Sequence, residues 1–160
     1  MILKDFITYH QQQEILNWSK TLVLTDEPNF TSIVDIPYEP RCLTEIRTKC
    51  LNASTGITYL NSIIAPFVLG VPVGSNINTH VDGTCNITFE GVAGNYNHVR
   101  FVILIQKPDV GGKLISDGNI IDLEEGDCFI LDTSLEHSLS KVEGLKDYFS
   151  LAFPFEIKIN

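Results

Sequence analysis

Short apolar runs separated by glycine-containing turns fill the chain from about Ile57 to its end. The runs are rich in Val, Ile, Phe and Thr, a composition that predicts β-strands, and their close spacing predicts antiparallel pairing. We expect strands at residues 63–71, 76–80, 86–89, 99–106, 113–116, 119–123, 128–132, 138–142 and 147–155.

One of these runs is apolar on both faces. Residues 99–105 read Val-Arg-Phe-Val-Ile-Leu-Ile, so that Arg100 is the one charged residue in the run. A strand of this kind must be covered on both sides, which places it in the centre of a sheet. Many short strands around such a centre predict a barrel or sandwich of the jelly-roll kind.

The first third of the chain has a different pattern of apolar residues. Apolar residues recur at helical spacing over residues 5–22, which predicts an amphipathic helix, and residues 43–51 predict a second one. Residues 26–40 contain three prolines and predict an irregular connection. We therefore expect a single domain over 1–160, with helical support in 1–55 and a β core in 57–156.

Charge and targeting signals narrow the functional class. Eleven Lys and Arg against twenty Asp and Glu give a net charge of −9, which disfavours binding to nucleic acids and to anionic membranes. The N-terminus lacks a signal peptide pattern and no apolar run has transmembrane length, so we expect a cytoplasmic protein. The four cysteines form no CxxC pair, so they predict buried thiols rather than a zinc site.

The sequence Thr-His-Val-Asp-Gly at residues 79–83 closes one expected strand. His80 and Asp82 are two positions apart, so their side chains project from the same face and can converge on one metal ion. His137 stands 55 positions beyond Asp82 (137 − 82), beside a later strand, and is the candidate third ligand. Two histidines and one carboxylate on one side of an octahedral iron(II) leave three positions open for a 2-oxo acid and dioxygen.

The motif has a simpler interpretation, in which Asp82 only forms the turn with Gly83. Four His and ten Asp in 160 residues produce a chance His-x-Asp in roughly one sequence in four, as short motifs often do. The strand end, the glycine turn and the later histidine together favour the metal site.

The second half of the chain resembles the iron(II)- and 2-oxoglutarate-dependent oxygenases, and within them the aspartyl/asparaginyl β-hydroxylase-like branch. The resemblance covers about residues 74–154 and is carried by His80-Val81-Asp82, the strand with Arg100, the turn at residues 111–114, and residues 125–137. That last block, Glu-Gly-Asp-Cys-Phe-Ile-Leu-Asp-Thr-Ser-Leu-Glu-His, is the most specific part.

The resemblance implies a double-stranded β-helix and an enzyme that hydroxylates an unactivated C–H bond while 2-oxoglutarate becomes succinate and carbon dioxide. It implies iron held by His80, Asp82 and His137, and Arg100 as the cation for the 2-oxoglutarate carboxylate. A second basic anchor is expected after the distal histidine. Lys146, nine positions on (146 − 137), fills that role in sequence, or else is an exposed lysine at a strand entrance.

Asp132 is expected to orient the loop that carries His137, as a hydrogen-bond acceptor or turn former. Some aspartyl hydroxylases of this branch have glycine where Asp82 stands, whereas proline hydroxylases share the full triad. The substrate is therefore expected to be an amino acid, a peptide side chain or a similar small molecule.

Two other functions remain open at this stage. One is a cupin-type metal protein on the same scaffold that makes no use of 2-oxoglutarate, although the chain lacks a second histidine two residues after His80. The other is a degenerate oxygenase fold retained as a non-catalytic binding module.

Overall fold

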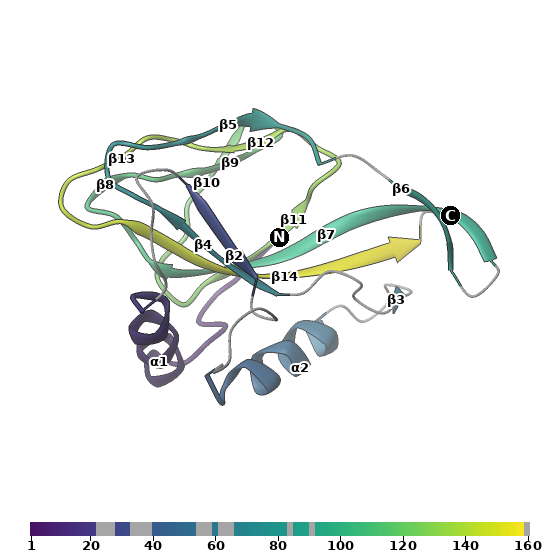
Figure 1. The fold of residues 1–160 in the computed structure, drawn as a ribbon, viewed down its shortest axis with the longest axis horizontal. Coiled ribbons are helices and arrows are strands. Elements are labelled where there is room, and N and C mark those ends of the chain that lie inside the picture. Colours follow the sequence, from purple (N-terminus) through teal and green to yellow (C-terminus); the bar gives the residue numbers. More distant parts are fainter. Residues whose placement is uncertain are drawn as a thin grey trace.

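The computed structural model describes residues 1–21, 28–32, 40–53, 59–60, 66–82, 85–89 and 92–158. In this part of the chain two antiparallel β-sheets face each other, and two helices lie on the outer side of the larger sheet (Figure 1). The expected mainly-β architecture, a double-stranded β-helix with N-terminal helices packed on one sheet, is confirmed.

The larger sheet is built around β7 (Val92–Gln106) and β14 (Tyr148–Lys158), which pair along most of their length. Its order is β1 (Ile2–Leu3), β11 (Cys128–Asp132), β7, β14, β4 (Phe67–Val71) and β2 (Asn29–Ser32). Two more strands join its long members: β6 (Cys85–Phe89) pairs with β7, and β3 (Tyr59–Leu60) pairs with β14.

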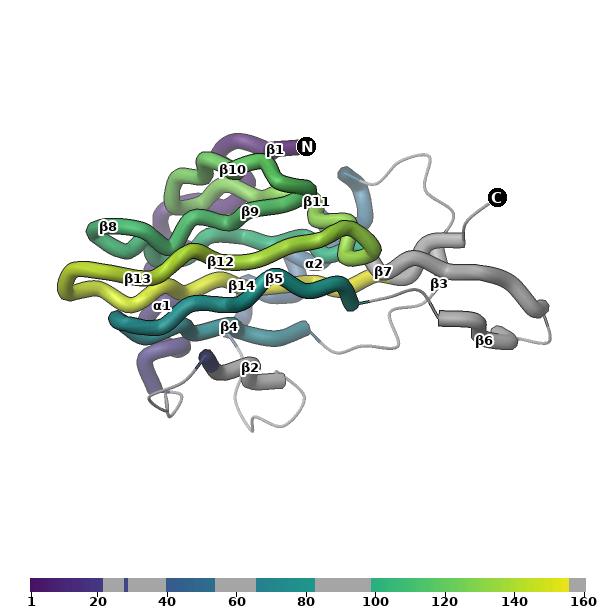
Figure 2. The backbone as a smooth tube through the Cα atoms, turned by 90° about the horizontal axis from the view of Figure 1, so that it is seen from above, coloured from purple at the N-terminus to yellow at the C-terminus, as the bar shows by residue number. Residues whose placement is uncertain are grey.

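The smaller sheet lies across the barrel from it, and Figure 2 shows its strands in front of the larger sheet. Its order is β10 (Asn119–Ile121), β9 (Leu114–Ser116), β12 (His137–Leu139) and β5 (Ile77–His80). A separate ribbon, β8 (Val110–Gly111) with β13 (Val142–Glu143), closes one end.

Two helices cover the outer face of the larger sheet. Helix α1 (Tyr9–Ser19) begins at a capping box, in which the Thr8 hydroxyl accepts a hydrogen bond from the Gln11 backbone and the Gln11 side chain accepts one from Thr8 N–H. Helix α2 (Leu43–Ala53) buries Leu43, Ile46 and Cys50, which share one face because they are three and seven positions apart.

Strand β7 separates two hydrophobic clusters. Phe101, Ile103 and Ile105 pack with the helices, whereas Val102 and Leu104 face the smaller sheet. This alternation follows from the two-residue period of a strand. The expectation that residues 99–105 form a central strand covered on both sides is confirmed.

The element boundaries differ from the expected ones mainly near the N-terminus. Residues 5–22 do not form one helix, because Ile2 and Leu3 pair with β11 and Ile7 N–H donates to the Gly126 carbonyl before α1 begins. The connection expected at 26–40 contains β2, and its residues 26–27 and 33–39 lie outside the described part.

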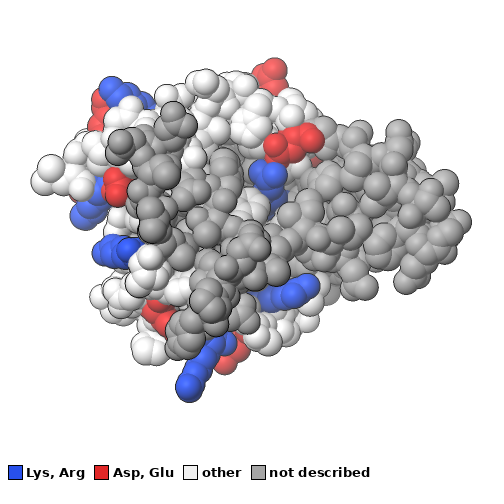
Figure 3. Space-filling view, viewed as in Figure 1, with Lys and Arg blue, Asp and Glu red and all other residues white. Residues whose placement is uncertain are grey.

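Acidic and basic side chains are interspersed over the face in Figure 3, where described residues are visible. Neither described helix has the length and apolar character needed to cross a membrane. Cys42, Cys50 and Cys128 are buried, as expected, and belong to no disulfide. Burial raises the pKa of the Cys42 and Cys50 thiols to about 12.

Candidate metal centre

The end of β5 supplies two of the three predicted metal ligands. His80 is the last residue of the strand, and Asp82 follows two positions later. The Asp82 backbone N–H donates to the Thr133 carbonyl at 3.0 Å, so the chain still follows the barrel wall after the strand has ended. Both side chains consequently point to the same side, as the two-residue spacing predicts.

Strand pairing places the third predicted ligand beside the first. His137 is the first residue of β12, which runs antiparallel to β5, and its direct partner in the register is His80. A tight turn precedes it, in which Asp132 Oδ1 accepts hydrogen bonds from Ser134 N–H at 3.0 Å and from the Ser134 hydroxyl at 2.6 Å. Asp132 thus shapes the turn that leads to His137.

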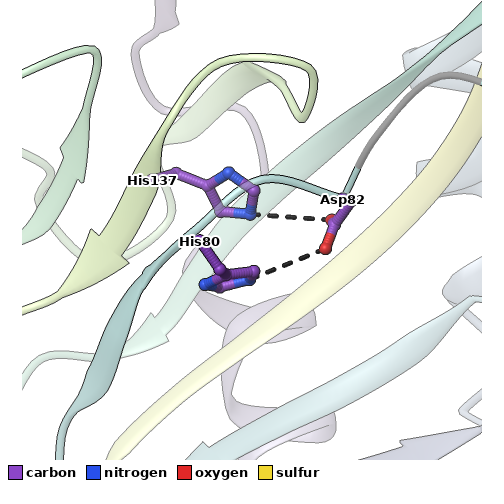
Figure 4. A group of neighbouring side chains, drawn as sticks. All are labelled: His80, Asp82 and His137. Atoms are coloured by element: carbon purple, nitrogen blue, oxygen red, sulfur yellow. Dashed lines mark ion pairs between the residues drawn. The ribbon is translucent and has the colours of Figure 1, made fainter.

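The three side chains converge on one point, as Figure 4 shows. Asp82 Oδ1 lies 3.6 Å from His80 Nε2, and Asp82 Oδ2 lies 3.6 Å from His137 Nε2. One ligand atom from each residue falls within 4.8 Å of the other two. These separations leave room for one ion bound to all three side chains.

Hydrogen bonds at the far side of each ring orient the two imidazoles. His80 Nδ1 lies 2.8 Å from the Asn78 carbonyl, and His137 Nδ1 lies 2.9 Å from the Leu135 carbonyl. A carbonyl only accepts, so each Nδ1 carries the proton and each Nε2 presents a lone pair. This tautomer is the one that metal-binding histidines use when a backbone carbonyl holds the other nitrogen.

His137 Nε2 is the atom that fits a metal best. It is buried and has no hydrogen-bond partner among the described residues, although buried polar atoms are normally satisfied. Burial lowers the pKa of His137, while the Leu135 carbonyl opposes that shift, so the ring is neutral and able to bind an ion at pH 7. An ion facing His80 and Asp82 would satisfy this atom.

Arg100 lies directly beside this group, in the centre of the larger sheet. Its Nη2 is 2.5 Å from Asp82 Oδ2, and its guanidinium carbon lies 5.4 Å from the centre of the Phe67 ring. Burial lowers the pKa of Arg100 and Asp82 opposes that shift, so the guanidinium remains charged.

A cavity extends from His80 and His137 into the barrel between the two sheets. Its walls are mostly apolar and include Leu69, Ile77, Val102 and Leu131. Its polar lining falls into two groups. His80, Arg100 and His137 belong to the metal end, where Ser138 follows His137 on β12, while Tyr148 and Ser150 come from the first part of β14.

Tyr148 and Ser150 were not anticipated from the sequence. Both are almost fully buried, and Ser150 Oγ makes no hydrogen bond of regular geometry within the part of the chain that the structure describes. Burial raises the pKa of Tyr148 to about 12, against the opposing effect of the nearby Ser150 hydroxyl. Within the strand expected at residues 147–155, Ser150 is the one polar residue between apolar neighbours, and Tyr148 precedes it by two positions and so lies on the same face.

Lys146, the second predicted anchor, lies elsewhere. Its side chain is 60% exposed, and its Nζ lies 3.4 Å from Asp109 Oδ1. It borders a surface depression together with Lys20 and Gln106 rather than the cavity that contains Arg100. The structure therefore brings Arg100 to the three candidate ligands but not Lys146.

No family model and no curated protein matches the sequence. Solved structures do match the fold. Viral collagen prolyl hydroxylase vCPH from Paramecium Bursaria Chlorella virus-1, in its 2OG complex, superposes with a TM-score of 0.71 at 13% identity and covers 100% of this chain and 96% of that one. The chain has the fold of a 2-oxoglutarate oxygenase.

Two further structures agree. HygX from Streptomyces hygroscopicus, with nickel, 2-oxoglutarate and hygromycin B bound, has a TM-score of 0.71 at 10% identity, covering 97% of this chain and 81% of that one. An oxidoreductase of the 2OG-Fe(II) oxygenase family from Burkholderia pseudomallei has a TM-score of 0.66 at 15% identity, covering 98% and 83%. At these identities the likeness establishes the fold, and the chemistry must be argued from the chain's own residues.

Proposed function

We propose that the chain is an iron(II)- and 2-oxoglutarate-dependent dioxygenase. It would hydroxylate an unactivated C–H bond of an amino acid, a peptide side chain or a similar small molecule, releasing succinate and carbon dioxide. The observation that carries this proposal is the unpartnered Nε2 of His137, which faces His80 and Asp82 at the mouth of a cavity.

The donor set favours iron(II). Two imidazole nitrogens and one carboxylate oxygen on one side of an ion leave three further octahedral positions, which suit a chelating 2-oxo acid and dioxygen. Structural zinc sites are usually closed by four protein ligands, and the described residues contain no fourth His, Cys, Asp or Glu grouped with these three.

Iron, 2-oxoglutarate and dioxygen would together supply the oxidising chemistry, and the protein's own residues would bind, orient and exclude water. The cavity is lined mostly by apolar residues such as Leu69, Ile77 and Leu131, which would exclude water around its few polar groups. Held neutral by burial, His137 needs to release no proton when the metal binds at pH 7.

For the co-substrate we propose Arg100 as the cation and Ser150 as a neutral hydrogen-bond donor. Arg100 has five N–H groups, and the single contact with Asp82 leaves others for a carboxylate. Lys146 was the second predicted anchor. Its exposed position beside Asp109 gives that assignment no geometric support, and a direct comparison of variants, described below, tests it.

The substrate class and the branch of the family are further parts of the proposal. The similar structures include a collagen prolyl hydroxylase and a protein with hygromycin B bound, so this fold accommodates both peptide and small-molecule ligands. The motif at residues 125–137 supports the aspartyl/asparaginyl β-hydroxylase-like branch, whereas the presence of Asp82 favours a relative of the proline hydroxylases.

The test is anaerobic reconstitution of the purified protein with iron(II), followed by 2-oxoglutarate. A weak visible metal-to-ligand charge-transfer band is expected in the unmutated protein and in His10→Ala, which changes an exposed histidine on α1. His137→Ala should show no band. Substrates are then screened through succinate release.

The outcomes separate the alternative functions. Iron uptake without the band would favour a cupin-type metal protein that does not use 2-oxoglutarate. No iron uptake by the unmutated protein would favour a non-catalytic binding module and would overturn the proposal.

A further inference from the structure

We infer that Arg100 is a positioning residue for the metal ligand Asp82, whose carboxylate it holds so that one oxygen is presented to the ion. The inference rests on the proposed function, because it concerns the same metal centre. It adds a role for Arg100 in metal binding that is separate from its proposed contact with 2-oxoglutarate.

The contacts of Asp82 divide between its two oxygens. Oδ2 is held by Arg100 Nη2 at 2.5 Å and lies 3.6 Å from His137 Nε2, whereas Oδ1 lies 3.6 Å from His80 Nε2. Because the two groups carry opposite charges, this contact is a charge-assisted hydrogen bond. Oδ1 is therefore the oxygen that Arg100 leaves available, and it lies on the side of His80.

Arg100 itself is held in place by the sheet. Its backbone lies on β7, paired with Leu131 of β11 on one side and with Pro154 of β14 on the other. The guanidinium rests against the Phe67 ring and its side chain is 21% exposed. A cation fixed in this way loses little further entropy when it binds a carboxylate.

The ion pair also limits how Asp82 can bind a metal. A carboxylate with two free oxygens can chelate an ion and occupy two coordination positions. Arg100 makes Oδ2 a poorer donor, so Asp82 binds through Oδ1 and takes a single position. Three positions then stay open, which is the number that the proposed chemistry requires.

Cobalt(II) titration without 2-oxoglutarate tests this role, with the visible spectrum and the Kd as readouts. Arg100→Met should weaken cobalt binding about tenfold or more, the usual effect of removing a group that orients a metal ligand, and should change the spectrum. Arg100→Lys should restore part of the affinity, because it returns one donor. Lys146→Met removes a positive charge at an exposed site and should change neither readout.

Unchanged or tighter cobalt binding by a folded Arg100→Met protein, with an unchanged spectrum, would overturn the inference while leaving the proposed function intact. No cobalt uptake by the unmutated protein would overturn both. If circular dichroism shows that Arg100→Met is unfolded, Arg100→Lys decides: a Kd and spectrum equal to those of the unmutated protein reject the positioning role, and a weakened Kd with a changed spectrum supports it.

Discussion

Two buried polar atoms in the cavity lack the partners that such atoms normally have. His137 Nε2 and Ser150 Oγ are both enclosed without a hydrogen bond of regular geometry. Each unsatisfied group costs about 1–3 kcal/mol of stability in the free protein. A bound ion at the first and a hydrogen-bond acceptor at the second would recover that free energy, so ligand binding and stability are linked at these positions.

Ser150→Ala should therefore affect stability and binding in opposite directions. Removing an unsatisfied hydroxyl should raise the free energy of unfolding by up to about 1 kcal/mol, while 2-oxoglutarate binding to the metal-loaded protein weakens. Urea unfolding and a titration of the charge-transfer band measure the two effects. A clear loss of stability would instead show that Tyr148 satisfies the Ser150 hydroxyl.

Substitutions of the two predicted anchors should affect the affinity for 2-oxoglutarate differently. At saturating iron, Arg100→Met should weaken 2-oxoglutarate binding about tenfold or more, because a charged hydrogen bond contributes about 1.5–3 kcal/mol. Lys146→Met should leave the affinity nearly unchanged, since its ammonium group lies by Asp109 and is exposed. The reverse result would assign the anchor to Lys146.

Short spacing made part of the site predictable from the sequence. The pair His80 and Asp82 could be inferred because a strand fixes the direction of residues two apart. His137 could be named only as a candidate third ligand, since local spacing does not encode the pairing of β12 with β5 that places it directly beside His80. The contact between Arg100 and Asp82 depends on tertiary packing, which no local pattern encodes.

Among the elements, the turn before β11 connects the N-terminal residues to the barrel through hydrogen bonds. The buried Asp127 carboxylate accepts hydrogen bonds from Lys4 Nζ at 2.6 Å, Glu124 N–H at 2.9 Å and Asp5 N–H at 3.1 Å. Burial by itself raises the pKa of Asp127, but these donors outweigh it and the net pKa is lowered. The carboxylate therefore stabilises the fold in its charged form.

Asp127→Asn should lower the free energy of unfolding by about 1–3 kcal/mol at pH 7. Because the folded pKa lies below the ordinary value of 3.8, this contribution is fully present above pH 3.8 and is lost as pH falls through the folded pKa. Urea unfolding at pH 7 and below pH 3.8 should show the difference between the variant and the unmutated protein shrinking. Asp122→Asn, at an exposed pair with Lys113, is the control and should change little.

The ribbon of β8 and β13 depends on a close approach at Gly111. The residue has a φ of +71°, and a Cβ there would lie 1.9 Å from the Lys141 carbonyl oxygen. Gly111→Ala should destabilise the protein by more than about 3 kcal/mol, since strain and a backbone clash add. Gly118, with a φ of +72° and open space around it, is the matched control.

Gly118→Ala should lose about 1–2 kcal/mol, the cost of the left-handed backbone conformation alone. Thermal melting of the two variants separates clash from strain. Equal losses in both would show that the contact between β8 and β13 relaxes at little cost.

Elements in the β core were more predictable than those at the ends of the chain. Cys128–Asp132 forms β11 with the expected bounds, because an apolar run between two turns has few alternatives. Strand β7 begins at Val92 rather than 99, since it pairs there with β6, and the glycine and polar residues at 94–98 do not signal a strand. A strand as short as β1 is defined by its pairing with β11, so the sequence alone does not predict it.

At the scale of the whole molecule, ligand binding should raise stability through mass action. A metal at about 100 times its Kd adds roughly 2.7 kcal/mol to the free energy of unfolding, which corresponds to roughly 5–10 °C in Tm for a chain of this size. Differential scanning calorimetry with manganese(II) measures the shift. His137→Ala should abolish it, and His10→Ala should retain it.

The two faces of β7 have consequences for how such a protein changes over evolution. Phe101, Ile103 and Ile105 hold the helices, while Arg100, Val102 and Leu104 face the barrel interior, so alternate positions of one strand carry separate tasks. Mutations that reshape the interior can accumulate while the helix-packed face preserves the stability of the fold. Directed evolution toward new substrates should therefore be confined to the interior-facing positions, leaving their neighbours on the strand untouched.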